Sequence, residues 1–342
     1  MSIRCLVTGA AGFIGSHLSA ALLARGWRVL GLDNFDPFYT SAIKRRNIAR
    51  IEDAGGDFRF VRVDLRSAQA LTDLMRDTTP DVVFHCAALA GVRSSVAAPG
   101  RYADVNIGGT LNLLDAMNTC GCPPLVLLSS SSVYGAAAAL PFCEHDPCAA
   151  PSSPYAATKR ASELLARSWS MLDADRRVCI LRLFSVYGPS QRPDLAVHSF
   201  MRALAGNKPI RVFGDGRTSR DYTYIDDIIR GVLAAADRLI ESQDEPCDLF
   251  NLGSGRSVAL NDLIDCLGFI VGCEPVIVHD PAAAGDMTHT HADLSRAASE
   301  LGYVPQTSLM AGLETQWQWY IQQRPDTFSR SAACLSNSAV SR

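Results

Sequence analysis

The sequence predicts a doubly wound α/β fold, in which a parallel sheet lies between two layers of helices. Through the first 185 residues, apolar runs of strand length alternate with segments of helix length. These runs are rich in Val and Leu and show little alternation, which is typical of strands buried on both faces. Right-handed connections between successive parallel strands then place helices on both sides of the sheet.

The elements are expected in a regular order along the chain. A first strand ends at Thr8. Further strands are expected at 28–33, 58–63, 82–84, 125–128 and 178–183, and helices at 15–24, 102–117 and 155–172. From Gly188 onward the pattern becomes irregular, with turn clusters such as 214–216. A second, smaller region is therefore expected to begin here.

Three glycines at three-residue spacing, Gly9, Gly12 and Gly15, lie between the first strand and the first helix. Glycine there lets the chain turn tightly, lets the backbone approach a pyrophosphate and lets the helix pack close to the sheet. The freed N–H groups and the positive end of the helix dipole then hold the anion. The pattern predicts a dinucleotide cofactor.

A carboxylate, Asp33, ends the second strand at about the 20-residue spacing that this kind of site requires. An acidic side chain at this place accepts hydrogen bonds from the ribose hydroxyls of the adenosine. Because a carboxylate also repels a 2′-phosphate, the predicted cofactor is NAD rather than NADP. We expect residues 1–185, with a return segment at about 218–255, to form a Rossmann NAD-binding domain.

The composition excludes several classes of function. The chain has 342 residues, is 48% hydrophobic and carries a net charge of −3. It can bury a large core, but it has no basic excess for nucleic acid or an anionic membrane. No apolar run approaches the roughly 18 residues of a membrane helix, and the first strand begins too near Met1 to leave room for a signal peptide. We expect a cytoplasmic protein that binds neither nucleic acid nor membrane.

The chain contains eleven cysteines, scattered without a framework, which favours reduced side chains over disulfides. Cys143, His145 and Cys148 place three potential metal ligands within six positions. Because no fourth ligand is evident and no C-x-x-C pair occurs, we expect no metal at this cluster.

A tyrosine and a lysine four residues apart, Tyr155 and Lys159, follow the serine-rich end of a buried strand, residues 129–132. Positions i and i+4 share one helix face, so the ammonium group can lie near the phenol and favour its ionised form. The alternative is a solvated pair on an exposed helix. The serine-rich strand end favours a catalytic pair, because ligands bind at the carboxyl ends of strands in an open parallel sheet.

These motifs together resemble the extended short-chain dehydrogenase/reductase family, and within it the nucleotide-sugar epimerases. The resemblance also covers His85 to Ala88, Arg182 to Pro189 and Arg220 to Asp227, and it extends over about residues 3–325. It implies a redox-neutral cycle in which Tyr155 removes the proton of the sugar C4 hydroxyl and NAD⁺ accepts the C4 hydride. Ser130 would bridge that hydroxyl and Tyr155, and the hydride would return to the other face of a 4-keto sugar.

The resemblance implies a set of binding residues. Cofactor contacts are expected from Gly9, Gly12, Phe13, Ile14, Gly15, Asp33, Asn34, Asp64, Leu65, Ala87, Ala88, Asn106, Tyr155 and Lys159. Contacts to a UDP-sugar substrate are expected from Arg93, Ser130, Ser131, Ser132, Ser185, Arg192 and Arg220. Residues 186–217 and 256–325 would form the nucleotide-sugar-binding region, whereas 326–342, rich in Ser and Ala without periodicity, are expected to be a disordered tail.

The identity of the sugar depends on a few positions. The 4,6-dehydratases carry an Asp-Glu pair where this chain has Ser131 and Ser132, so dehydration is not expected. Segments such as 188–194 resemble UDP-glucuronate 4-epimerases more than UDP-glucose 4-epimerases. The guanidinium of Arg192 can bind a sugar carboxylate as a bidentate pair. The chain departs from these relatives at Ser185, where Thr is usual, and at 190–191, where Ser-Gln replaces Trp-Gly.

Several alternatives remain open at this point. Arg192 could be a surface arginine that precedes a proline, and the substrate would then be a UDP-hexose such as UDP-glucose. A decarboxylase is a further alternative, because oxidation of a glucuronate at C4 yields a β-keto acid that loses CO₂ readily. The last alternative is a regulatory protein that binds NAD but catalyses no reaction. Such proteins usually lack the Tyr or the Lys of the catalytic pair, whereas this chain has both Tyr155 and Lys159. The family resemblance also suggests a homodimer through the helices that begin near Tyr102 and Tyr155.

Overall fold

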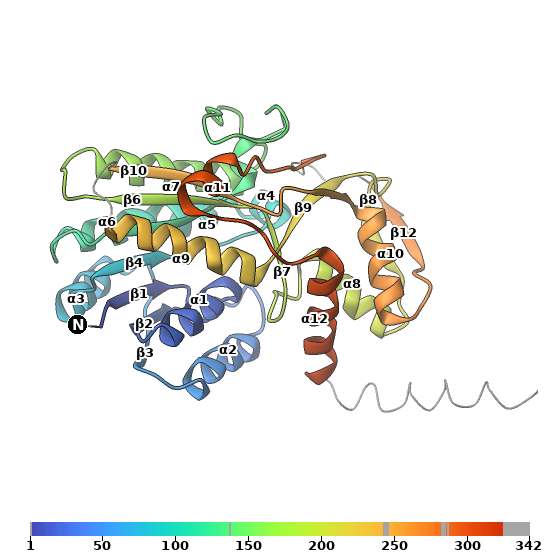
Figure 1. The fold of residues 1–342 in the computed structure, drawn as a ribbon, viewed down its shortest axis with the longest axis horizontal. Helices are drawn as coiled ribbons and strands as arrows, with labels where there is room; N and C mark the ends of the chain where they lie inside the picture. Colours follow the sequence, from blue (N-terminus) through green and yellow to red (C-terminus); the bar gives the residue numbers. More distant parts are fainter. Residues whose placement is uncertain (1, 137, 242–245, 282–284, 286, 324–342) are drawn as a thin grey trace, which may run out of the picture.

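The computed structural model describes residues 2–136, 138–241, 246–281, 285 and 287–323, and the expected tail at 326–342 lies outside this part (Figure 1). Its centre is a seven-stranded sheet in the order β10-β6-β5-β4-β1-β2-β3, with every neighbouring pair parallel. The strands are β1 (Arg4–Thr8), β2 (Arg28–Asp33), β3 (Phe58–Arg62), β4 (Val82–His85), β5 (Leu125–Ser130), β6 (Val178–Leu183) and β10 (Cys247–Leu252).

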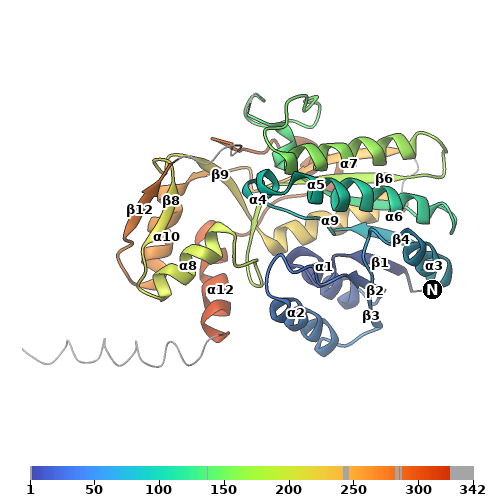
Figure 2. The ribbon, with the colours of Figure 1, turned by 180° about the vertical axis from the view of Figure 1, so that it is seen from behind.

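Helices cover both faces of this sheet, which confirms the doubly wound fold. One face packs against α1 (Phe13–Ala24) and α9 (Ile225–Glu241), which lie in front of the sheet in Figure 1. The other packs against α3 (Ala68–Thr78), α6 (Gly109–Met117) and α7 (Pro154–Ser170), and α6 and α7 are in front in Figure 2. Along β1, Cys5 and Val7 enter one core and Leu6 enters the other, so the strand is buried on both sides.

The remaining elements adjoin the central sheet and its helical layers. Those that precede α7 in the chain are α2 (Ser41–Asp53), α4 (Val92–Ala97), α5 (Pro99–Tyr102), the π-helix η1 (Ala103–Gly108) and the 3₁₀ turn η2 (Ser131–Tyr134). Two small sheets, β11-β9-β7 and β12-β8, contain β7 (Ser185–Tyr187), β8 (Ile210–Phe213), β9 (Ser219–Tyr224), β11 (Ser257–Ala259) and β12 (Ile277–Asp280). Helices α8 (Ala196–Ala205), α10 (Leu260–Val271) and α12 (Leu309–Gln322) pack against these small sheets, whereas α11 (Ser295–Leu301) packs against α9 and β10.

The expected single helix at 102–117 is interrupted by one π-helical segment, η1. The wider turn carries Asn106, whose side chain accepts a hydrogen bond from Leu89 N and donates to Leu89 O and to Thr158 Oγ1. A π-helical turn contains one more residue than an α-helical turn. This wider turn places the side chain of Asn106 between the loop after β4 and helix α7. In the described part of the chain, no helix is long and apolar enough to cross a membrane.

A buried histidine joins the centre of the sheet to its helical layer. His85, at the end of β4, is 2% exposed and makes hydrogen bonds with Thr8 Oγ1 at 2.8 Å and Thr110 Oγ1 at 3.1 Å. Burial, followed by the charge of Lys159, lowers the pKa of His85 to about 3. The neutral imidazole therefore links β1, β4 and α6 at neutral pH.

We predict that acid destabilises the fold partly through His85. The unfolded imidazole titrates near ~6.5, so between that pH and the folded value of about 3 the unfolded state binds more protons. The free energy of unfolding should fall as the pH falls through this window, by up to about 1.4 kcal/mol per pH unit for one group. Thermal unfolding of the wild type and of His85→Gln, from about pH 7 to about pH 4, measures this slope. A variant with an unchanged slope would contradict the prediction.

Candidate active site

The turn between β1 and α1 is packed too closely for side chains. Gly9 has a φ of +71°, and a Cβ added there would lie 2.9 Å from the backbone of Ala87. A Cβ at Gly15 would lie 2.2 Å from the carbonyl oxygen of Gly9, and Gly12 N donates to the same oxygen at 2.9 Å. The glycines thus provide an open backbone cradle at the N-terminus of a helix, the environment that a pyrophosphate requires.

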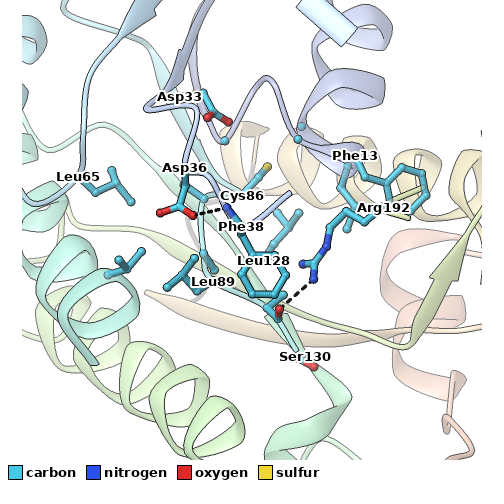
Figure 3. A pocket seen from close by; sticks show the side chains of 18 of the residues that line it. Phe13, Asp33, Asp36, Phe38, Leu65, Cys86, Leu89, Leu128, Ser130 and Arg192 are labelled. Atoms are coloured by element: carbon cyan, nitrogen blue, oxygen red, sulfur yellow. Dashed lines mark hydrogen bonds between the residues drawn. The ribbon is translucent and has the colours of Figure 1, made fainter. Parts of the chain in front are cut away.

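A cavity of about 290 Å³ opens above this turn, along the carboxyl ends of β1, β2, β4, β5 and β6 (Figure 3). It brings together most of the residues predicted for the site, from the glycine turn to the catalytic pair. These are Gly9, Gly12, Phe13, Ile14, Gly15, Asp33, Asn34, Asp64, Leu65, Ala87, Ala88, Ser130, Tyr155, Lys159 and Arg192.

Six predicted residues lie outside this lining. Asn106 is buried behind it and holds the loop that contains Leu89. Ser131 and Ser132 lie in η2, next to Ser130, whose hydroxyl oxygen accepts from Ser132 N at 3.2 Å.

The other three belong to the substrate side. Ser185 lies in β7, while the guanidinium of Arg93 stacks on the Phe213 ring at 4.3 Å. Arg220 donates to the carbonyl oxygens of Ser219 and Thr288.

The adenosine end of the cavity is built from β2 and the segment that follows it. Asp33 is 7% exposed and accepts from Phe35 N at 2.7 Å. Asn34 donates to Asp64 Oδ2 at 2.9 Å, and Arg66 hydrogen bonds hold the pKa of that carboxyl well below its usual range. Two acidic side chains are thus fixed at the ends of neighbouring strands, β2 and β3.

The prediction missed part of this wall, namely Asp36, Phe38, Tyr39, Lys44 and Leu89. One of them had a signal in the sequence. Lys44 shares the buried face of α2 with Ile48 and Ile51, at spacings of four and seven residues. A lysine on an apolar helix face needs a buried partner. That partner is Asp33, whose Oδ1 lies 3.6 Å from Lys44 Nζ.

The catalytic pair enters from the first turns of α7, which begins at Pro154 after the N-cap Ser153. Burial raises the pKa of Tyr155, whereas a hydrogen bond with Ser130 and then the charge of Arg192 lower it. Lys159 donates from Nζ to the carbonyl oxygen of Leu128 at 2.6 Å, and burial lowers its pKa to about 8. The ammonium of Lys159 thus contacts the end of β5, and Ser130 is a further group that favours the phenolate. The support of the phenolate by Lys159 stays a prediction.

Arg192 lies in the wall of the cavity with its side chain 13% exposed, so it is not a surface arginine. Its Nε and Nη2 donate to the two carboxylate oxygens of Asp194 at 3.0 and 2.6 Å. Nη2 also donates to Ala90 O at 3.0 Å, and the guanidinium lies over the Phe38 ring at 4.8 Å (Figure 3). The guanidinium thus already binds one carboxylate in the bidentate manner predicted for a sugar acid.

The loop that carries Arg192 is held by polar contacts from three helices. From α12, Gln316 accepts from Gly188 N and donates to Gln191 Oε1. From α2, Arg50 donates to Ser190 Oγ, and His17 of α1 makes a hydrogen bond with Pro189 O. The Ser-Gln pair that departs from the relatives is therefore buried and satisfied.

Comparison with known proteins agrees with this geometry. Residues 5–253 match the model of the NAD dependent epimerase/dehydratase family. The chain belongs to this family. UDP-glucuronate 4-epimerase 4 of Arabidopsis thaliana is 40% identical over 93% of this chain and 75% of its own length. The UDP-glucuronate 4-epimerase of Thermodesulfobacterium geofontis is 38% identical over 92% of this chain and 95% of its own length.

A solved structure gives the same result. The UDP-glucuronic acid 4-epimerase of Bacillus cereus, in complex with UDP-glucuronic acid and NAD, has a TM-score of 0.87 and 36% identity, covering 94% of this chain and 100% of that one. The family resemblance and the NAD cofactor predicted from the sequence are confirmed.

The cluster of Cys143, His145 and Cys148 does not form a metal site in the described structure. Cys143 Sγ donates to Asp293 Oδ2 at 3.2 Å, and burial raises the pKa of the Cys143 and Cys148 thiols. Within the described ranges, no group of three or more His, Cys, Asp or Glu side chains could hold a metal ion.

We predict that Gly15→Ala abolishes retention of NAD. The new methyl group would lie 2.2 Å from Gly9 O, so the turn must open and the backbone cradle is lost. Gly100→Ala is the matched control, because a Cβ there meets nothing within 4 Å. Nucleotide released on denaturing the purified proteins can be quantified by absorbance. Equal NAD content in wild type, Gly15→Ala and Gly100→Ala would contradict the role given to this turn.

Proposed function

We propose that this protein catalyses the NAD-dependent C4 epimerisation of UDP-glucuronate to UDP-galacturonate. The observation that carries the proposal is the position of Arg192, a carboxylate-binding guanidinium in the wall of the cavity that also contains Tyr155. The two lie close enough for the charge of Arg192 to lower the pKa of Tyr155. Relatives named as UDP-glucuronate 4-epimerases, which cover most of the chain, support the same substrate.

The cofactor would be held by the glycine turn at the pyrophosphate, by Asp33 at the adenosine ribose, and by Lys159 near the catalytic tyrosine. When bound, NAD⁺ supplies the acceptor, and afterwards the donor, of the C4 hydride. Tyr155 acts as the phenolate, which its hydrogen bond with Ser130 favours. It takes the proton of the C4 hydroxyl and becomes the neutral phenol. The same phenol returns its proton to the inverted C4 oxygen, so the reaction is balanced without an added acid.

A 4-keto glucuronate must be protected from loss of CO₂. Decarboxylation requires the bond to the carboxylate to align with the π-system of the ketone. A bidentate pair with Arg192 would hold the carboxylate away from this alignment. Ser131, Ser132 and Ser185 would add hydroxyl donors on the same side. The sugar carboxylate would replace that of Asp194 as the partner of Arg192, because one guanidinium edge cannot serve both.

The alternatives fit this arrangement less well. A UDP-glucose 4-epimerase has no use for a guanidinium beside the sugar, and a decarboxylase needs the carboxylate to align. A regulator without chemistry has no need of the hydrogen bond between Ser130 and Tyr155.

We further propose that separate regions of the chain bind the cofactor and the substrate, as expected from the sequence. Residues 1–185 with about 218–255 would hold NAD, and 186–217 with 256–325 would hold the UDP-sugar. The return segment is supported by β10, which pairs with β6 in the main sheet. We also propose a cytoplasmic homodimer. The two copies would meet through α6 and α7. Exposed apolar side chains in these helices and just after α7 support this interface; they are Leu111, Leu164, Met171 and Leu172.

We predict that Tyr155→Phe lowers turnover of UDP-glucuronate by at least ~10²-fold, the typical effect of losing a general base. The ring and its packing against Tyr102 remain, so the NAD content and the melting temperature should stay near those of the wild type. Product chromatography with UDP-glucuronate measures the loss. Turnover near that of the wild type would exclude Tyr155 as the base.

We predict that Arg192→Ala selectively weakens binding of the sugar acid. A charge-assisted hydrogen-bonded pair contributes on the order of 1.5–3 kcal/mol, or roughly one to two decades of affinity. UDP-glucose, with a hydroxymethyl group at that position, should bind nearly as before. Calorimetric titration of both sugars in the Tyr155→Phe background avoids turnover.

Arg192→Lys is the control, because lysine keeps the positive charge but cannot form a bidentate pair. Its affinity for UDP-glucuronate should lie between that of the protein with Arg192 and that of Arg192→Ala. Equal losses for UDP-glucuronate and UDP-glucose in Arg192→Ala would overturn the glucuronate assignment. They would leave a UDP-hexose 4-epimerase as the better proposal.

A further inference from the structure

The carboxylate that selects NAD is part of a buried ion pair. Lys44 is 6% exposed, and its Nζ lies 3.6 Å from Asp33 Oδ1 and 5.0 Å from the centre of the Tyr39 ring. All three side chains line the central cavity. The negative charge of Asp33 therefore acts beside a fixed positive charge, and the pair has no net charge.

Further cations lie next to this pair. A second cavity of about 380 Å³ shares Tyr39 with the first and is lined by Arg45 of α2 and Arg62 of β3. Arg62 lies over the Phe35 ring and donates from Nε to Asn34 O at 3.3 Å, directly after Asp33 in the chain. The other carboxylates at this end, Asp64 and Asp36, are paired with Arg66 and Arg101. The surroundings of the expected adenosine ribose therefore carry a net positive charge once Asp33 is set aside.

We propose that Lys44 is a second cofactor-specificity residue, which would bind the 2′-phosphate of NADP if Asp33 did not occupy it. The preference for NAD would then depend on one carboxylate, Asp33, which blocks a cationic site that could otherwise bind a phosphate. A 2′-phosphate would stand beside position 33, in contact with Lys44. An ammonium that now lies 3.6 Å from a carboxylate can pair with another anion beside it once the charge of that carboxylate is removed. The inference concerns the cofactor end only and does not depend on which sugar is bound.

The test compares NADP⁺ and NAD⁺ binding in four proteins: wild type, Asp33→Asn, the double variant Asp33→Asn/Lys44→Met, and Asp33→Asn/Lys208→Met. Lys208 is the matched control, because it is an exposed lysine in the loop before β8, away from the cavity. Proteins stripped of nucleotide are titrated in a calorimeter, and nucleotides that co-purify with untreated protein are identified by chromatography.

Asp33→Asn should bind NADP⁺ at least ~10-fold more tightly than the wild type, as expected for one charge-assisted pair, and added salt should reduce the gain. The gain should disappear in the Lys44→Met double variant and persist in the Lys208→Met one. A gain that survives loss of Lys44, or no gain in Asp33→Asn with an unchanged melting temperature, would overturn the proposal. If Asp33→Asn fails to fold, Asp33→Ser supports the same four comparisons with the smaller side chain.

Discussion

The close approach of the β1–α1 turn to the end of β4 determines the geometry of the whole site. No side chain fits at Gly9 or Gly15, so the backbone of the turn lies against Ala87 and leaves its upper side open. Thr8, just before the turn, accepts from Ala87 N and makes a hydrogen bond with His85. A backbone contact, which any larger residue would break, thus aligns the two central strands at their carboxyl ends.

Buried polar contacts carry this alignment to the catalytic helix. His85 contacts Thr110 of α6, and the Thr110 hydroxyl donates to Asn106 O. Asn106 in turn donates to Thr158, which lies in α7 between the proposed catalytic residues Tyr155 and Lys159. Each of these side chains is buried, so an unpaired partner would be costly. The cradle for the cofactor and the proposed base are therefore positioned by one continuous set of contacts.

Two charged residues of the cavity have partners inside the protein. Arg192 binds Asp194, and Asp33 binds Lys44. In both cases an internal carboxylate pairs with a cation that could otherwise bind a ligand anion: Asp194 pairs with Arg192, and Asp33 pairs with Lys44. Such pairs avoid an uncompensated buried charge before ligands arrive. They also make recognition an exchange of partners, which favours ligands that replace the lost interaction.

Local patterns in the sequence predicted six of the seven strands of the main sheet, the glycine turn, Asp33, Tyr155 and Lys159, because those features depend on short-range periodicity and spacing. The strand β10 and the strands of the two small sheets were not predicted. The local patterns also did not predict the fold-back of residues 36–44 over the cavity, since that contact depends on how α2 packs against the sheet. The hydrogen bond from Lys159 to the carbonyl oxygen of Leu128 was not predicted either, for a related reason. Helical spacing places Tyr155 and Lys159 on one face, but the buried ammonium takes the carbonyl of the neighbouring strand.

The proposed epimerisation requires a single site that oxidises C4 of the sugar and returns the same hydride to the opposite face of C4. It is tested most directly with UDP-glucuronate carrying deuterium at C4, analysed by mass spectrometry and NMR after conversion. The proposed function predicts UDP-galacturonate with the deuterium retained at C4 and no pentose product. Loss of the label to solvent or to added cofactor, or release of CO₂ with a UDP-pentose, would contradict it.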